Sequence, residues 1–249
     1  MAHRLRGRYG YPADEPFRVT FHPDRLEEPL HWRKPQRVFV CSMGDLFHEA
    51  VSCVWQWQVF ATMRLMPEHT FLVLTKRPSV MHNFITDFDT PPKIERTLHQ
   101  RGYCLADIDE WPLPNVWLGV TVEDQQRADE RIPILLATPA AKRFVSCEPL
   151  LGPVDLSPYL ASLVSTAPSP MNAYGLPGTT PALDHIIAGG ESGPGARPTR
   201  VEWVQGLRDQ CQAAGVPFFF KNWGSYWDKI AGVPAGHLLD GQEHREFPS

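Results

Sequence analysis

The stretch VWLGVTVED, residues 116–124, decides the fold because a mainly apolar run leads without alternation into two carboxylates. A short, continuous apolar run is typical of a strand that is buried on both faces of a parallel sheet. Five other runs share this pattern: Arg37 to Cys41, Thr70 to Thr75, Arg143 to Cys147, His185 to Ala188 and Pro217 to Lys221. Together with Val116 to Val122, they predict six buried strands.

Helix signals lie between these runs. A capping residue or a terminating glycine marks three segments: 52–66 behind Ser52, 125–131 behind Asp124, and 201–214 ahead of Gly215. Pro133 is expected to start a second short turn after the middle segment. Strands that alternate with helices predict an α/β fold, and the chain length suits a parallel (βα) partial TIM-like barrel of about six strands.

Two stretches interrupt the alternation of strands and helices. Residues 87–114 contain a proline pair and a charged patch, and residues 157–181 are rich in Ser, Pro, Ala and Gly. We expect both to be surface excursions of a single domain that covers residues 1–249, because strands resume beyond each of them. The second stretch is expected to be irregular and exposed.

Composition excludes several classes of protein. With 43% hydrophobic and 21% charged residues, the 249-residue chain is globular rather than disordered. A net charge of -4 gives no general support for nucleic-acid binding, although a local basic groove is compatible with it. The sequence shows neither a membrane-length apolar run nor a signal peptide, so we expect a cytoplasmic protein with no membrane partner. The five Cys are scattered and predict neither a disulfide framework nor a metal site.

Charged side chains follow the predicted strands where each strand ends. In parallel α/β folds the working residues gather at this edge of the sheet. Because buried charges need partners, the set suits a pocket for a polar, zwitterionic ligand, and the alternative is a ring of structural ion pairs. The residues concerned are Asp45, Lys76, Arg77, Glu123, Glu148, Glu191 and Lys221. Five of them are expected to line one pocket: Glu123, Glu148, Glu191, Lys76 and Lys221.

The segment GGESGPGARP, residues 189–198, is the sharpest single motif. Its glycines can adopt positive φ and direct backbone N–H groups at an anion. Glu191 is suited to hold an ammonium group, and Arg197 a carboxylate or phosphate. The alternative is a tight, proline-rich turn whose glycines satisfy only steric needs. The candidate ligand-binding residues of this segment are Gly189, Gly190, Glu191, Ser192 and Arg197.

Asp45, His48 and Lys221 are the candidate catalytic residues. Asp45 and His48 are three positions apart, so a helical backbone would place them on one face as an acid–base pair or a metal-binding pair. The alternative is local capping by Asp45 beside a partly buried His48. Cys147 ends a predicted strand as a nucleophile would, but we interpret it as a buried, small apolar residue because a His base is not evident beside it.

The ordered motifs SMGDLFH, LTKRP, GVTVED, RFVSCEPLLGP, GGESGPGARP and FFFKNWG resemble a known family. The family groups phage-associated proteins of unknown function with radical-SAM-like barrels, and its distant relatives include enzymes of the spore photoproduct lyase type. The resemblance extends from His3 to the C-terminal LLDGQEHREFP. It implies a radical-SAM-like enzyme or an inactive relative. By charge matching alone, Glu191 or Glu148 would hold the ammonium of S-adenosylmethionine. Lys76, Arg77 or Arg197 would hold its carboxylate.

The sequence departs from the family pattern at its beginning. Members carry an upstream segment with clustered Cys, which resembles a site for a 4Fe-4S cluster that binds S-adenosylmethionine. MAHRLRGRYGYP resembles the sequence that follows this segment, so we expect a longer form to hold both cofactors. The first barrel strand would also be missing, which would leave an open sheet edge. No residue of this chain is assigned as a metal ligand.

Two other classes of function remain open at this point. A non-enzymatic phage or host accessory protein would bind nucleic acid or a protein partner. It would show a continuous basic stripe of Arg4, Arg6, Arg8, Arg18, Lys34 and Arg37. A metal-free hydrolase would need Asp45 and His48 within hydrogen-bonding reach of each other. The sequence does not identify a substrate.

Overall fold

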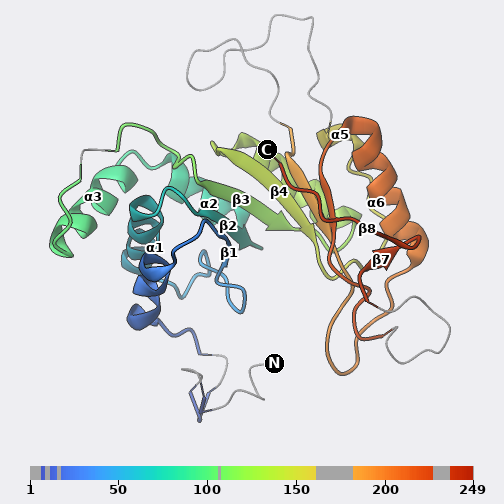
Figure 1. The fold of residues 1–249 in the computed structure, drawn as a ribbon, viewed down its shortest axis with the longest axis horizontal. Coiled ribbons are helices and arrows are strands. Elements are labelled where there is room, and N and C mark those ends of the chain that lie inside the picture. Colours follow the sequence, from blue (N-terminus) through green and yellow to red (C-terminus); the bar gives the residue numbers. More distant parts are fainter. Residues whose placement is uncertain are drawn as a thin grey trace, which may run out of the picture. The chain divides into compact units, whose positions relative to one another are not determined.

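Six parallel strands form one sheet whose spatial order, β1-β2-β3-β4-β5-β6, is the order of the chain (Figure 1). The computed structural model describes residues 7–8, 12–15, 18–105, 108–160, 182–226 and 236–248. The strands are β1 (Arg37–Val40), β2 (Thr70–Thr75), β3 (Val116–Thr121), β4 (Lys142–Cys147), β5 (His185–Ala188) and β6 (Phe218–Phe220). Helices alternate with them, which confirms the predicted α/β parallel partial barrel.

The remaining elements connect or follow these strands. The helices are η2 (Pro23–His31), α1 (Cys53–Leu65), α2 (Pro78–Thr86), α3 (Thr90–Gln100), α4 (Gln125–Ala137), α5 (Ser157–Leu160) and α6 (Val201–Ala214). A short antiparallel pair, β7 (Leu238–Leu239) and β8 (Gln242–Glu243), lies near the C-terminus. None of the helices in the described ranges is long and apolar enough to cross a membrane.

The structure divides into two compact units, Met1–Trp117 with Pro139–Ala141, and Leu118–Thr138 with Lys142–Ser249. In the first unit, α1 packs against α3 and η2. The Ser52 side chain caps α1 by accepting the N–H of Trp55, as the sequence predicts. At the other end of α1, the Asn115 amide donates to the carbonyls of Met63 and Met66, which satisfies groups that a helix end leaves open.

In the second unit, β4, β5 and β6 pair in parallel with Phe144 opposite His185 and Ile186 opposite Phe218. Two predicted helix signals are confirmed here. Asp124 accepts the N–H of Arg127 as the cap of α4, and Gly215 adopts the left-handed conformation that ends α6. Buried apolar side chains on both faces of β3, β4 and β5 leave only their ends available for polar chemistry.

Burial of β1 differs from the prediction that every strand is buried on both faces. Its residues are alternately exposed and half-buried, and 40% of Phe39 is exposed. The physical reason is position, because β1 is the last strand of the sheet order. Continuous apolar runs in a sequence do not distinguish a terminal strand from a central one.

Both stretches that were expected to be surface excursions contain a helix in the part that the structure describes. Residues 87–114 contain α3, whose Ile94, Thr97 and Leu98 recur at helical spacing and are buried, while the charged residues occupy its other face. In the second excursion, 157–160 form α5, and 161–181 lie outside the described residues. Pro133 does not start a separate turn, because α4 continues through it as one helix.

The contact between Gly119 of β3 and the buried Phe144 ring gives a test of this packing. A Cβ at position 119 would lie 2.5 Å from Phe144 Cζ. We expect Gly119→Ala to lower the free energy of unfolding by about 1–3 kcal/mol because it overpacks the core. Gly206→Ala, in α6 with no atom within 4 Å of the added Cβ, is the control and should be neutral or stabilising by up to about 1 kcal/mol. Urea unfolding measures both, and equal effects would contradict the packing.

Candidate functional site

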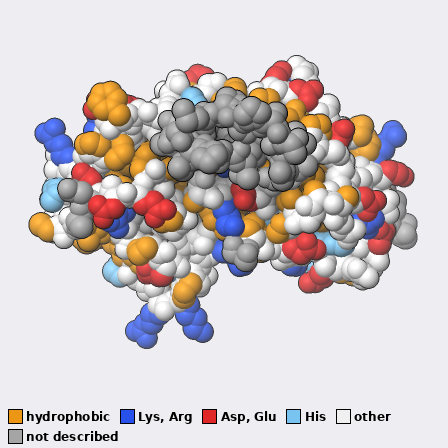
Figure 2. Space-filling view, turned by 90° about the horizontal axis from the view of Figure 1, so that it is seen from above, with side chains coloured by type: hydrophobic (Ala, Val, Ile, Leu, Met, Phe, Trp, Pro, Cys, Tyr) orange, Lys and Arg blue, Asp and Glu red, His pale blue; other side chains and the backbone are white. Residues whose placement is uncertain are grey.

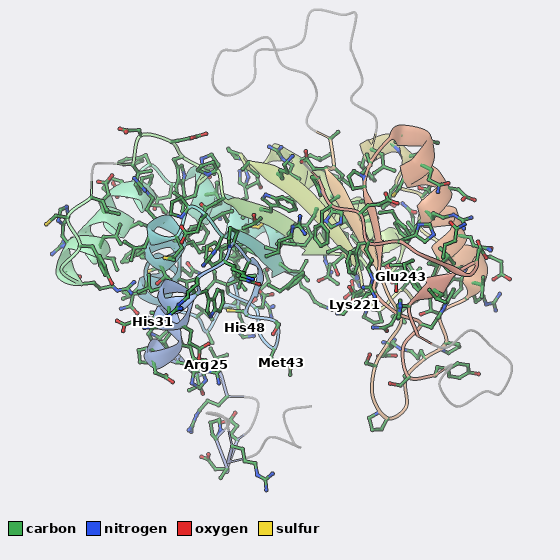
Figure 3. The ribbon with its side chains drawn as sticks, in the orientation of Figure 1. Arg25, His31, Met43, His48, Lys221 and Glu243 are labelled. Atoms are coloured by element: carbon green, nitrogen blue, oxygen red, sulfur yellow. The ribbon has the colours of Figure 1, made fainter. Side chains whose placement is uncertain are left out.

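Glu148 and Lys221 join the carboxyl ends of β4 and β6 in the second unit. Lys221 Nζ lies 2.7 Å from Glu148 Oε2, and 19% of the Glu148 side chain and 55% of the Lys221 side chain are exposed. The Lys221 N–H donates to the carbonyl of Ala188, so the ends of β5 and β6 are also connected. Lys221 is labelled in Figure 3. The pair therefore lies at the edge where parallel strands present ligand-binding residues.

Gly189 and Gly190 follow β5 beside this pair. A Cβ at Gly189 would lie 3.2 Å from Glu148 Cδ, and one at Gly190 would lie 2.0 Å from the Trp223 carbonyl oxygen. Their N–H groups donate to the carbonyls of Cys147 and Asn222. Close approach of the Glu148 side chain to Gly189 and of the Trp223 backbone to Gly190, rather than positive φ, thus accounts for these two glycines, and their N–H groups are already engaged within the protein.

The loop after Gly190 is closed by an ion pair. Arg197 donates to the carboxylate of Glu191 through its backbone N–H, Nε and Nη2 at 2.8–3.0 Å. These hydrogen bonds lower the pKa of Glu191 to about 2. Within the same loop Gly193 and Gly195 adopt positive φ, and Ser192 is exposed.

Glu123, at the end of β3, is held by α4. Arg131 Nη1 lies 2.9 Å from Glu123 Oε2 and also donates to the Thr121 carbonyl. Both side chains are nearly buried, with 12% of Glu123 and 13% of Arg131 exposed. The positive charge of Arg131 compensates for the desolvation of the Glu123 carboxylate. This arrangement is the one expected of a structural ion pair.

Asp45 organises the corresponding edge of the first unit. Its carboxylate accepts hydrogen bonds from Thr75 Oγ1 at 2.8 Å, Arg77 Nη1 at 2.9 Å and the N–H of Lys76 at 3.1 Å. A fourth donor is the N–H of Phe47. The ends of β1 and β2 are therefore connected through one carboxylate.

His48 takes a different partner from Asp45. Its Nδ1 accepts the N–H of Ala50, and residues 41–52 form turns rather than a helix. Met43 and His48 lie on this loop in Figure 3. The described hydrogen bonds of Asp45 and His48 do not join the two side chains, so the geometry that a metal-free hydrolase needs is not formed.

The structure thus distributes the predicted site residues over several pairs. Asp45, Lys76 and Arg77 belong to the first unit, and the Glu residues, Lys221 and the glycine segment belong to the second. Glu148 and Lys221 are brought together, whereas Glu123 and Glu191 have their own arginines. The prediction of one shared pocket stays a prediction. The sequence analysis did not identify Arg131 or Thr75 as part of the site. Of the two, only Thr75 could have been recognised, from its position at the end of a predicted strand.

The cysteines do not fit an iron–sulfur cluster. Cys41, Cys53 and Cys104 are exposed, and Cys147 and Cys211 are buried. No three His, Cys, Asp or Glu side chains of the described ranges form a group that could hold a metal. Burial raises the pKa of Cys147 and raises that of Cys211 to about 12, so both thiols keep their protons, in agreement with the interpretation of Cys147 as an apolar residue.

Fold and site together define an α/β protein of the parallel (βα) partial-barrel class, with charged residues where its strands end. The chain belongs to the family described as "Protein of unknown function (DUF5131)", which matches residues 1–248. Comparisons with curated proteins and with solved structures gave no match.

The Glu191–Arg197 pair predicts a specific pH dependence. Because the pKa of Glu191 is lower in the folded chain than its ordinary value of about 4.3, the pair stabilises the fold fully above that pH. This contribution is lost as the pH falls toward about 2. Arg197→Gln should return the pKa of Glu191 to about 4.3, measured by carboxyl NMR titration. Arg200→Gln is the control, because the Arg200 guanidinium lies over the Trp203 ring. This substitution should leave the pKa of Glu191 unchanged.

Iron–sulfur reconstitution tests the placement of the cysteines. A cluster of this kind needs three thiolates that converge on one site. We expect anaerobic incubation of residues 1–249 with iron and sulfide to give no stoichiometric thiolate–iron charge-transfer absorbance. Uptake of one cluster per chain would show that distant cysteines do converge in solution.

Proposed function

We propose that this protein is a phage-associated, radical-SAM-like (βα) protein whose second unit binds the amino-acid end of S-adenosylmethionine. The Glu148–Lys221 pair at the ends of β4 and β6 is the observation that carries the proposal. It presents one carboxylate and one ammonium group at the edge of a parallel sheet, and an α-amino acid carries the same two charges in complementary form.

Glu148 would accept the ligand ammonium, and Lys221 would donate to the ligand carboxylate. Lys221 donates one N–H to Glu148 and has two further N–H groups on a side chain that is 55% exposed. A zwitterion that inserts between the two groups keeps both charges paired, so the exchange leaves neither charge buried alone. An anion alone or a cation alone would pair with only one of the two groups and would leave the other unpaired.

The backbone beside the pair supports this use. Gly189 leaves the space above its Cα open to Glu148, because a Cβ there would come within 3.2 Å of Glu148 Cδ. The Glu191–Arg197 pair holds the following loop in place. Radical chemistry would be supplied by an iron–sulfur cluster, which the cysteines of this chain do not fit, and we assign no step through it.

Isothermal titration of residues 1–249 with S-adenosylmethionine tests the proposal. We expect Glu148→Gln and Lys221→Ala each to weaken binding roughly tenfold or more, since each removes one charge-assisted hydrogen bond. Lys93→Ala is the matched control, because Lys93 pairs with Asp87 and Asp89 in the first unit. It should bind as the parent does.

Ligand analogues complete the design. Methylthioadenosine, which lacks the amino-acid end, should bind weakly and equally to the parent and both variants. Thermal unfolding of each variant separates a loss of binding from a loss of folding. An absence of binding by the parent chain at millimolar ligand, or unchanged binding by folded Lys221→Ala, would contradict the proposal.

A further inference from the structure

A wide, open groove in the first unit is lined by the end of η2, the segment that follows it and β1, and it is distinct from the strand-end residues. Its volume is about 710 Å³. Its lining includes the side chains of His31, Trp32, Arg33, Lys34, Arg37 and Phe39. All six are exposed, so the groove is accessible along its length. His31 is labelled in Figure 3.

The lining is cationic. Arg33, Lys34 and Arg37 contribute three positive charges, and the described part of the lining contains no carboxylate. Among the described residues, Arg33 and Lys34 form no ion pair. By contrast, acidic and basic side chains are interspersed over the face shown in Figure 2. A concentration of one sign of charge in a protein with a net charge of -4 favours an anionic partner.

Two aromatic rings accompany these charges. Trp32 is 37% exposed and Phe39 is 40% exposed. The Trp32 ring contacts the buried His69 ring at a centroid distance of 5.5 Å, which limits the motion of Trp32. Arg37 and Phe39 are two residues apart on β1, so their side chains, a cation and a ring, lie on the same face of the strand.

We infer that this groove binds single-stranded nucleic acid. Arg33, Lys34 and Arg37 would contact phosphates, and Trp32 and Phe39 would stack on unpaired bases. Exposed rings beside the cations favour this partner over an acidic polypeptide, whose carboxylates need no flat surface. They also favour it over a duplex, whose bases are already stacked.

The described residues cover only part of the basic stripe that would favour an accessory protein. Lys34 and Arg37 line the groove, whereas Arg18 pairs with Asp14 on the exposed surface. Arg8 is exposed, and Arg4 and Arg6 lie outside the described residues. We therefore argue only from the cations that line the groove.

Fluorescence anisotropy with a labelled oligothymidine tests the inference on residues 1–249. We expect log Kd to change with log salt with a slope near 2, as for about three phosphate contacts on a single strand. Arg33→Gln with Lys34→Gln should lower this slope by about 1.4. Trp32→Ala should weaken binding roughly tenfold, and Trp32→Phe should restore most of it because a ring remains.

Matched controls and competitors decide between partners. Lys93→Ala removes a cation, and Phe88→Ala removes a ring that is 85% exposed, both away from the groove. Neither should change binding. Absence of binding at low salt, or equal binding by Trp32→Ala and the parent, would overturn the inference. Equal competition by polyglutamate would replace it with an acidic polypeptide partner, and equal competition by duplex DNA would remove its single-strand specificity.

Discussion

A carboxylate that follows a buried strand has to be compensated where it stands, and this constraint determines how the strand ends are organised. Glu123 and Arg131 are both almost buried, and an unpaired charge in either place would cost several kcal/mol. Asp45 follows the partly exposed β1, but only 14% of its side chain is exposed, and four donors compensate its charge, two of them from the backbone. The pairs therefore connect strand to helix and strand to strand, which fixes the loops that follow.

Local signals in the sequence predicted the elements well. The bounds of β2 and β5, the caps Ser52 and Asp124, and the terminating Gly215 follow from patterns within a few residues of each position. The helix α3 was missed because a charged patch conceals its buried face, although the spacing of Ile94 and Leu98 carried the signal. Burial of β1 was overestimated because a sequence run does not reveal which strand is terminal.

Partners at the candidate site were much harder to predict. Charge at the strand ends was visible in the sequence, but which charge meets which depends on contacts across long separations. Glu148 and Lys221 are 73 positions apart, and Arg77 is 32 positions from Asp45. The order of the strands in the sheet brings such residues together. That order can be predicted from the sequence only by assuming that consecutive strands are neighbours.

The accessibility of the charged group separates the structural ion pairs of this protein from the residues that we propose to bind ligands. Only 13% of the Arg131 side chain is exposed beside Glu123, whereas 55% of the Lys221 side chain is exposed beside its partner. Arg33 and Lys34 go further, since they form no ion pair within the described chain. A bound ligand gains most from charges that have no ion-pair partner within the protein, because binding then replaces no existing pair. The same chain therefore uses one set of charges to hold its fold, while the charges at the two proposed binding positions, in different units, stay more exposed.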